Sequence, residues 1–192
     1  MVPTPRLLIL TGPTASGKTA IALEWARQDR RIEIINADSL LVYRGFDIGT
    51  AKPSLKERQE VPHHLIDRVD PLENYTAGDF VRDAERAIED IHSRHRHALL
   101  VGGSGFYLKA LLYGLWDAPR DPEVRAKLDL ASSQALYEEL LQVDPESALR
   151  IGTHDRYRLL RSLEIWRISK KTPSSLRSTE SLKRDPRFSV WM

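Results

Sequence analysis

Short apolar runs alternate with amphipathic stretches along the first half of the chain. Arg6–Thr11, Arg31–Asn36 and Ala98–Val101 are apolar runs of strand length. Thr19–Arg27 and the stretch from Thr76 to about Ser93 instead carry apolar residues at helical spacing. Strands that alternate with helices are typical of α/β proteins, so we expect a parallel sheet with flanking helices.

Local signals mark the ends of these elements. Thr76-Ala77-Gly78-Asp79 is a capping box, which begins a helix, and His92 and Arg94 favour its C-terminal end. The polar segment 37–53 follows the second strand and contains two glycines and a proline. Long loops at strand ends commonly carry function.

The pattern changes after Pro119, where charged, helix-favouring sequence begins. Helices are predicted over Phe106–Gly114, Asp121–Leu130, Gln134–Val143 and Asp155–Ser169, and a last strand over Phe188–Trp191. We therefore expect three segments: an α/β core in residues 1–118, a small all-helical insert lobe with a return helix in residues 119–170, and a basic linker with a final core strand in residues 171–192.

Composition narrows the class of protein. The 192 residues are 41% hydrophobic and include no cysteine, which fits one sizeable core and excludes disulfides and thiolate sites. No apolar run approaches the roughly 18 residues of a membrane span. Residues 150–192 carry eleven Lys/Arg and four Asp/Glu, a charge of +7, against −5 for the rest. We expect a cytoplasmic monomer with a polyanionic partner, for which nucleic acid is the usual candidate.

The first apolar run leads into a loop that matches G-x-x-x-x-G-K-T, namely Gly12-Pro13-Thr14-Ala15-Ser16-Gly17-Lys18-Thr19. A position between a predicted strand and a predicted helix is the context that confirms such a motif. Its N–H groups can converge on phosphate oxygens, Lys18 adds a positive charge, and the Thr19 hydroxyl can bind Mg²⁺. These features predict a P-loop NTPase-like fold that binds a di- or triphosphate.

Two further segments follow predicted strands. Asp38 lies where ligands bind in open parallel sheets, so it could accept a proton, although it could equally cap the following turn. Gly102–Gly105 permits close backbone approach and offers the Ser104 hydroxyl, but an ordinary strand-to-helix turn fits as well.

Histidines and arginines allow a functional and a structural interpretation. His63 and His64 lack the acidic or cysteine partners of a metal site, so we expect them to be structural. The helix with Arg156, Arg158 and Arg161 could bind a polyanion or simply be a solvated face.

Several motifs in order resemble one family, the tRNA dimethylallyltransferases or tRNA isopentenyltransferases. They are GPTASGKT, INADSLLVYRGFDIGTAKP, VPHHLIDRVDP, YTAGDF, LLVGGSGFYLKALLYGL, DPEVRAKL and DRYRLLRSLEIWRISKKT. The resemblance implies transfer of a dimethylallyl group from dimethylallyl diphosphate to N6 of the adenosine 3′ of the anticodon. It implies tRNA, through its anticodon stem-loop, as the partner and Mg²⁺ as the cofactor.

The resemblance also implies roles for individual residues. Asp38 would be the general base, with Lys18 and Ser104 as further catalytic residues and Mg²⁺ on Thr19. The loop Gly12–Thr19 would hold the diphosphate. The implied tRNA contacts are Asp38, Ser39, Leu40, Leu41, Ser104, Arg125, Tyr157, Arg158, Leu159, Leu160 and Arg161.

The chain departs from the family pattern at several points. Leu41 replaces a common Gln, Gly152-Thr153-His154-Asp155 replaces a usual His-Pro-Asn-Asp stretch, and the helical insert is short. Family members continue beyond Trp191, so we expect a chain that lacks their C-terminal segment. Two alternatives therefore stay open: a P-loop NTP-dependent small-molecule kinase, and an inactive, truncated tRNA-binding remnant.

Overall fold

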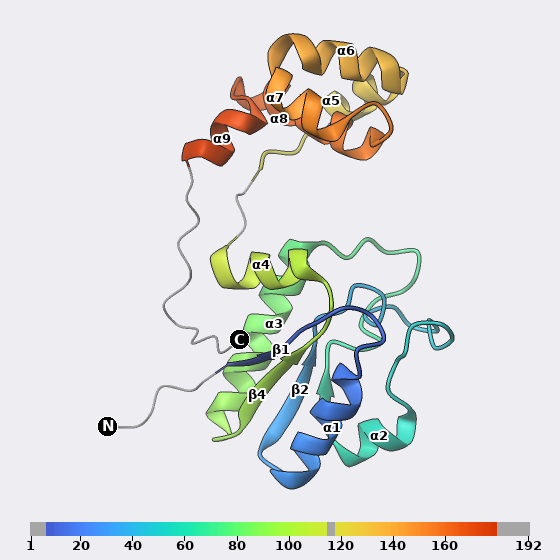
Figure 1. Cartoon of the computed structure of the whole chain (residues 1–192), viewed down its shortest axis with the longest axis vertical. Coiled ribbons are helices and arrows are strands. Elements are labelled where there is room, and N and C mark those ends of the chain that lie inside the picture. The colour runs from blue at the N-terminus through green and yellow to red at the C-terminus, as the bar shows by residue number, and fades with distance from the viewer. Residues whose placement is uncertain (1–6, 115–117, 180–192) are drawn as a thin grey trace. The chain divides into compact units, whose positions relative to one another are not determined.

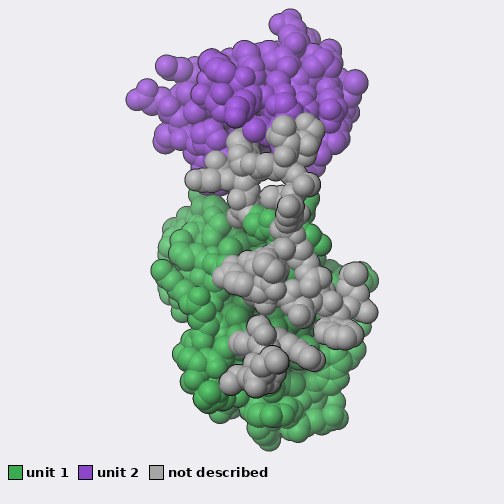
Figure 2. Space-filling model, turned by 90° about the vertical axis from the view of Figure 1, so that its left-hand side faces the viewer, with its two compact units in different colours: residues 1–115, 184–192 green, residues 116–183 purple. Residues whose placement is uncertain are grey.

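The computed structural model describes residues 7–114 and 118–179, which belong to two compact units. The first unit contains residues 7–114 and is an α/β structure, whereas residues 118–179 form an all-helical second unit (Figures 1 and 2). The strand predicted over Phe188–Trp191 lies outside the described residues. No described helix is long and apolar enough to cross a membrane.

The first unit is built on a four-stranded parallel sheet, which confirms the predicted fold class. The strands lie in the order β1 (Leu8–Leu10), β4 (His97–Val101), β2 (Ile32–Asn36) and β3 (His63–His64). Val101 pairs with Leu10 on one side and with Asn36 on the other, so three strands end at the same level. The loops that follow β1, β2 and β4 therefore emerge together.

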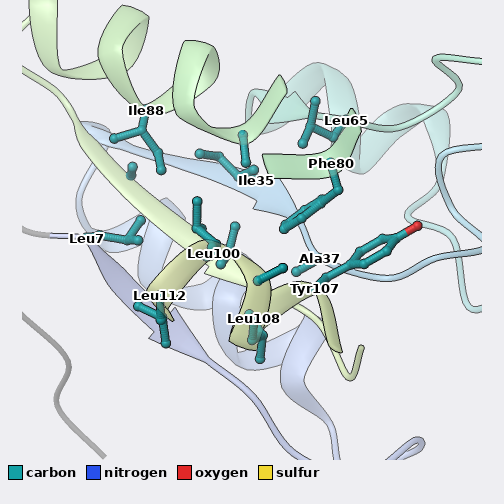
Figure 3. Close-up of a cluster of buried hydrophobic side chains, with 14 of the residues drawn as sticks. Leu7, Ile35, Ala37, Leu65, Phe80, Ile88, Leu100, Tyr107, Leu108 and Leu112 are labelled. Carbon is teal, nitrogen blue, oxygen red and sulfur yellow. The ribbon is translucent and has the colours of Figure 1, made fainter. Parts of the chain in front are cut away.

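Helices cover both faces of this sheet: α1 (Lys18–Gln28) on one face, and α3 (Ala77–Ser93) with α4 (Gly105–Tyr113) on the other. Successive residues of a strand face opposite sides. Ile34 and Leu99 accordingly pack with α1, while Ile35 and Leu100 pack with the other two helices (Figure 3). Both central strands are thus buried on both faces, which explains the apolar pair Ile34-Ile35 in β2 and the apolar run Ala98–Val101 in β4.

Helix beginnings follow the side chains that cap them. Thr76 Oγ1 accepts from Asp79 N at 3.2 Å, and Asp79 Oδ2 accepts from Thr76 N at 3.0 Å, which confirms the capping box of α3. Ser54 and Glu57 form the same box at α2 (Leu55–Glu60), a helix that was not predicted. β3 was not predicted either, since two histidines carry no apolar pattern.

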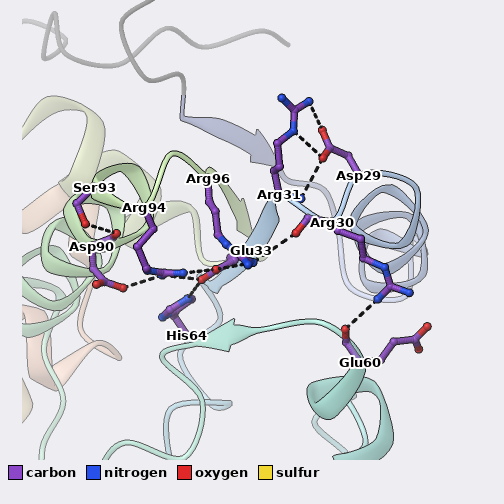
Figure 4. A network of polar contacts seen from close by, with 10 residues as sticks. All are labelled: Asp29, Arg30, Arg31, Glu33, Glu60, His64, Asp90, Ser93, Arg94 and Arg96. Atoms are coloured by element: carbon purple, nitrogen blue, oxygen red, sulfur yellow. Dashed lines mark hydrogen bonds and ion pairs between the residues drawn. The ribbon is translucent and has the colours of Figure 1, made fainter.

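One carboxylate is buried in the sheet and neutralised by cations (Figure 4). Glu33 of β2 is 2% exposed and accepts from Arg94 at 2.5 and 2.9 Å. His64 Nε2 lies 2.7 Å and Arg96 Nη1 3.1 Å from its oxygens. The hydrogen bonds from Arg94, followed by that from His64, hold the pKa of Glu33 at about 2 although burial opposes them.

The second unit confirms the predicted helical lobe. Its helices are α5 (Pro122–Asp129), α6 (Ser133–Val143), α7 (Pro145–Ile151), α8 (Arg156–Ser169) and α9 (Pro173–Thr179). Leu128, Leu136, Leu140 and Leu163 are at most 1% exposed and form its core. Helix α9 occupies part of the segment expected to be a linker, and Asp144 Oδ2 accepts from Ser174 N at 2.9 Å near its start.

Candidate functional site

The loop Gly12–Thr19 connects β1 to α1. Ala15 and Gly17 are left-handed, with φ of 63° and 80°, and α1 begins at Lys18. Such a conformation costs about 1 kcal/mol for alanine but turns successive N–H groups toward one point, which forms an anion-binding concavity. The Lys18 ammonium donates to Pro13 O at 2.6 Å and so lies over the loop. This geometry suits phosphate oxygens at a helix N-terminus.

Asp38 follows β2 and has one carboxylate oxygen in a local turn. Its Oδ1 accepts from Leu40 N at 2.9 Å, the turn-capping contact that sequence reasoning had weighed against a catalytic role. No described residue donates a hydrogen bond to its other oxygen, Oδ2. The two interpretations are therefore compatible, because one oxygen caps the turn while the second stays available to a ligand.

The loop after β4 lies directly against the segment that carries Asp38. A Cβ atom at Gly102 would lie 2.2 Å from both the carbonyl carbon and the oxygen of Ala37, so a side chain there has no room. Ser104 Oγ accepts from Ser39 N at 3.1 Å, and Ser104 N donates to Ala37 O at 3.3 Å. Both loops follow predicted strands, and the strand ends, which lie at the same level, bring them into contact.

A cavity of about 390 Å³ opens among these loops. Its lining includes the residues of the phosphate loop from Thr14 to Thr19 together with Asn36 and Asp38. Apolar lining residues include Ile34, Leu41, Pro53, Ile66 and Val101. Other predicted site residues of the first unit do not line it, namely Gly12, Pro13, Ser39, Leu40 and Ser104. A lining that combines charged and apolar side chains suits an amphipathic ligand.

Lys52 holds one wall of the cavity and was missed by sequence reasoning. Its side chain is 2% exposed, and its ammonium donates to Tyr43 O, Asp47 Oδ1 and Asp67 Oδ1 at 3.0, 2.8 and 2.6 Å. Burial opposes its charge, but the hydrogen bonds to Asp47 and Asp67 raise the pKa of Lys52. Arg58 also donates to Asp67, at 2.6 Å. These contacts fix the segment around Pro53.

The predicted tRNA contacts of the second unit lie on α5 and α8. Tyr157 is 67% exposed, and the Arg125 guanidinium lies 5.4 Å from the centre of its ring. Arg158 is exposed and pairs with Asp155 at 3.1 Å. A cation over an exposed aromatic ring is a surface suited to a nucleotide base and its phosphate.

Three residues of the same predicted run are engaged inside the second unit. Leu159 and Leu160 are 0% and 3% exposed and belong to its core, so their side chains do not reach the surface. Arg161 donates to the carbonyl oxygens of Pro119 and Ala118, each at 2.8 Å, and pairs with Glu164. We therefore remove both leucines from the set of side chains expected to contact tRNA.

The described residues contain no group of three or more His, Cys, Asp or Glu side chains that could hold a metal ion. Thr19 follows Lys18 and lines the cavity, and its hydroxyl is an oxygen donor of the kind that Mg²⁺ prefers. Mg²⁺ commonly binds one or two protein oxygens together with substrate phosphates and water. The donor set thus fits a magnesium ion that shares its ligands with a diphosphate.

Comparison with protein families gives a match over most of the chain. The model described as IPP transferase matches residues 41–192. Among curated proteins, the tRNA dimethylallyltransferase of Polaromonas sp. is 53% identical over 169 residues, which cover 85% of this chain and 50% of that protein. tRNA dimethylallyltransferase 1 of Citrifermentans bemidjiense is 48% identical over 174 residues, or 90% of this chain and 56% of that protein. The chain thus spans about half the length of the curated relatives it matches.

Solved structures give the same likeness. A eukaryotic dimethylallyltransferase acting on tRNA superposes with a TM-score of 0.81 and 29% identity, over 97% of this chain and 47% of that one. The full-length tRNA isopentenylpyrophosphate transferase of Bacillus halodurans superposes with a TM-score of 0.56 and 39% identity, over 88% of this chain and 57% of that one.

Proposed function

The chain belongs to the IPP transferase family, and we propose that it transfers a dimethylallyl group from dimethylallyl diphosphate to N6 of the adenosine 3′ of the anticodon in tRNA. The observation that carries the proposal is the shared cavity. The phosphate loop and Asp38 line one space of about 390 Å³ together with apolar residues. The phosphate loop suits a diphosphate, the apolar side chains suit a five-carbon chain, and the carboxylate suits a reacting amine.

The proposed reaction forms one bond and breaks another. The N6 amine attacks C1 of the dimethylallyl group, the C1–O bond breaks, and pyrophosphate leaves with the electron pair. N–H groups of the phosphate loop and the Lys18 ammonium stabilise the charge that grows on the leaving oxygen. Asp38 accepts the N6 proton, and Oδ2 is the oxygen placed to do so because Leu40 N already binds Oδ1.

Thr19 and Ser104 have supporting roles in this proposal. Thr19 would hold Mg²⁺, which adds positive charge to the leaving pyrophosphate. Ser104 Oγ accepts from Ser39 N, so its own hydroxyl proton stays available for a substrate oxygen. For tRNA we propose contacts by Asp38, Ser39, Leu40 and Leu41 in the first unit, and by Arg125, Tyr157, Arg158 and Arg161 in the second. The monomeric state and the cytoplasmic location stay predictions.

The test uses the full chain, labelled dimethylallyl diphosphate and an anticodon stem-loop. Label should appear in RNA when the base 3′ of the anticodon is adenine. It should not appear when that base is unsubstituted purine, which lacks the exocyclic amine. Asp38→Asn keeps the bond from Leu40 N but removes the base, so transfer should fall by about 100-fold or more. Transfer undiminished by Asp38→Asn would refute the assigned base.

The alternatives predict other products. A small-molecule kinase would consume ATP with Mg²⁺ and leave the RNA unlabelled, whereas a binding remnant would retain the stem-loop without labelling it or consuming ATP. Family membership favours transfer over both. Parallel assays of RNA labelling, ATP consumption and RNA retention therefore distinguish the three.

A further inference from the structure

Asn36 is the last residue of β2, 5% exposed, and its side-chain amide contacts two separate segments. Its Oδ1 accepts from Asp38 N at 2.9 Å. Its Nδ2 donates to the backbone oxygen of Asp38 and to that of Leu65, each at 3.0 Å. Because a backbone N–H only donates and a carbonyl oxygen only accepts, these partners fix the orientation of the amide.

The contacts hold the backbone of Asp38 from both sides. With its amide hydrogen and its carbonyl oxygen both bound to one rigid side chain, the peptide planes around Asp38 are fixed relative to β2. Oδ1 is bound by Leu40 N, which sets the rotation of the carboxylate. The direction of Oδ2 is therefore determined by Asn36 together with the turn to Leu40.

The third contact of Asn36 connects the Asp38 segment with the segment around Leu65. Leu65 is buried and left-handed, with a φ of 61°, a conformation that costs about 1–2 kcal/mol for such a residue. The hydrogen bond from Asn36 Nδ2 to its carbonyl oxygen helps to keep it there. The next residue, Ile66, lines the same cavity as Asp38. One side-chain amide thus contacts both the backbone of Asp38 and the segment that carries Ile66.

We propose that Asn36 is the positioning residue of this site, which directs the Asp38 carboxylate into the cavity. The role rests on the proposed transferase function and deepens it. Asn36 is not itself a proton acceptor here, since an amide is not basic and its donors and acceptor are already used. Its contribution is made through Asp38.

The kinetic test compares three variants of the full chain. Asn36→Ala should lower kcat by about 100-fold, as expected for a reacting group displaced by about 1 Å, and should change the KM for dimethylallyl diphosphate much less. Asn36→Ser can still accept from Asp38 N, as serine does in turns, and should recover at least about tenfold in kcat. Glu33→Gln is the control, because this buried side chain lies on the same strand and outside the cavity. It should destabilise the fold without lowering kcat.

A second readout does not need activity. Amide hydrogen exchange at Asp38, followed by NMR, should be at least about tenfold faster in Asn36→Ala than in Glu33→Gln at equal stability. In Asn36→Ser, whose hydroxyl still accepts from Asp38 N, exchange should be slower than in Asn36→Ala. A kcat of Asn36→Ala equal to that of Glu33→Gln, or unchanged exchange at Asp38, would overturn the proposal. If the unmodified chain transfers nothing, the proposed function fails, and the exchange measurement alone decides whether Asn36 holds Asp38.

Discussion

Adding one methyl group at Gly102 should move the segment that carries the base away from the phosphate loop. An alanine Cβ at this position would lie 2.2 Å from the Ala37 carbonyl carbon and oxygen, and 2.8 Å from its Cα. Ordinary contact begins at 3.4 Å, so the two backbones must separate by roughly 1.2 Å. No flexible side chain is available to absorb this shift, because every atom met first belongs to backbone.

The shift affects stability and rate by separable amounts. Overpacking of a well-packed interior lowers the free energy of unfolding by about 1–3 kcal/mol. A displacement of about 1 Å in a reacting group lowers the rate by about 100-fold. Pyrophosphate binding should change little, because the residues that would bind it, Thr14–Thr19, belong to a different loop. We therefore expect Gly102→Ala to lower kcat about 100-fold while the Kd for pyrophosphate stays near that of the unmodified chain.

The neighbouring glycine provides a matched control. A Cβ atom at Gly103 would meet only Gly12 O, at 3.4 Å, which is an ordinary contact. Gly103→Ala should therefore leave both kcat and the free energy of unfolding close to their original values. Urea unfolding, calorimetric titration with pyrophosphate and single-turnover transfer give the three quantities. Equal kcat values for the two variants would refute the reasoning from backbone contact.

Three further predictions follow from buried charges and the phosphate loop. Glu33→Gln should destabilise the chain by about 2 kcal/mol at neutral pH in urea unfolding, because Arg94 and Arg96 lose the buried carboxylate that they share, and Arg94 keeps only Asp90 among the described carboxylates. Since folding lowers the pKa of Glu33 from 4.5 to about 2, its stabilisation is present above about pH 4.5 and is lost as pH falls toward 2, and this acid-dependent loss should be absent from the variant. Lys52→Met leaves Asp67 with one cation, Arg58, and releases the cavity-lining segment around Pro53. It should therefore raise the KM for dimethylallyl diphosphate by about tenfold in transfer assays. An unchanged KM would contradict the assigned role. Lys18→Ala should raise the Kd for pyrophosphate by about 10-fold to 150-fold in calorimetric titration, as for one lost charge-assisted hydrogen bond.

Elements set by nearby residues could be predicted from the sequence, and those set by distant contacts could not. The three predicted strands, the capping box at Thr76 and the phosphate loop each depend on a few consecutive residues. β3 and α2 are two and six residues long, too short for a periodic signal. Lys52 was missed for another reason. Lysine is rarely buried, and nothing local indicates the distant carboxylate of Asp67 that allows it.

The interpretation of α8 shows how a family resemblance can obscure a local signal. Leu159, Leu160 and Leu163 recur at helical spacing and form an apolar stripe, which predicts a core-facing side. The resemblance suggested tRNA contact for the whole run from Tyr157 to Arg161. Burial assigns Leu159 and Leu160 to the core and leaves Tyr157 and Arg158 exposed. Periodicity was the better guide to which side chains of that run face outward.

In the proposed transfer, charge changes at two places in the cavity, the leaving oxygen and the base. Negative charge grows on the leaving oxygen beside Lys18, and a proton arrives at Asp38 on a different loop. Between them the reacting carbon becomes electron-poor, and water there would compete with the amine. Apolar side chains such as Ile66 and Val101 line the same cavity and disfavour water in it. The position of Lys18 is set by a local motif, whereas the position of Asp38 depends on the close approach of Gly102 to Ala37. The orientation of the base is therefore more sensitive to substitution than the phosphate loop.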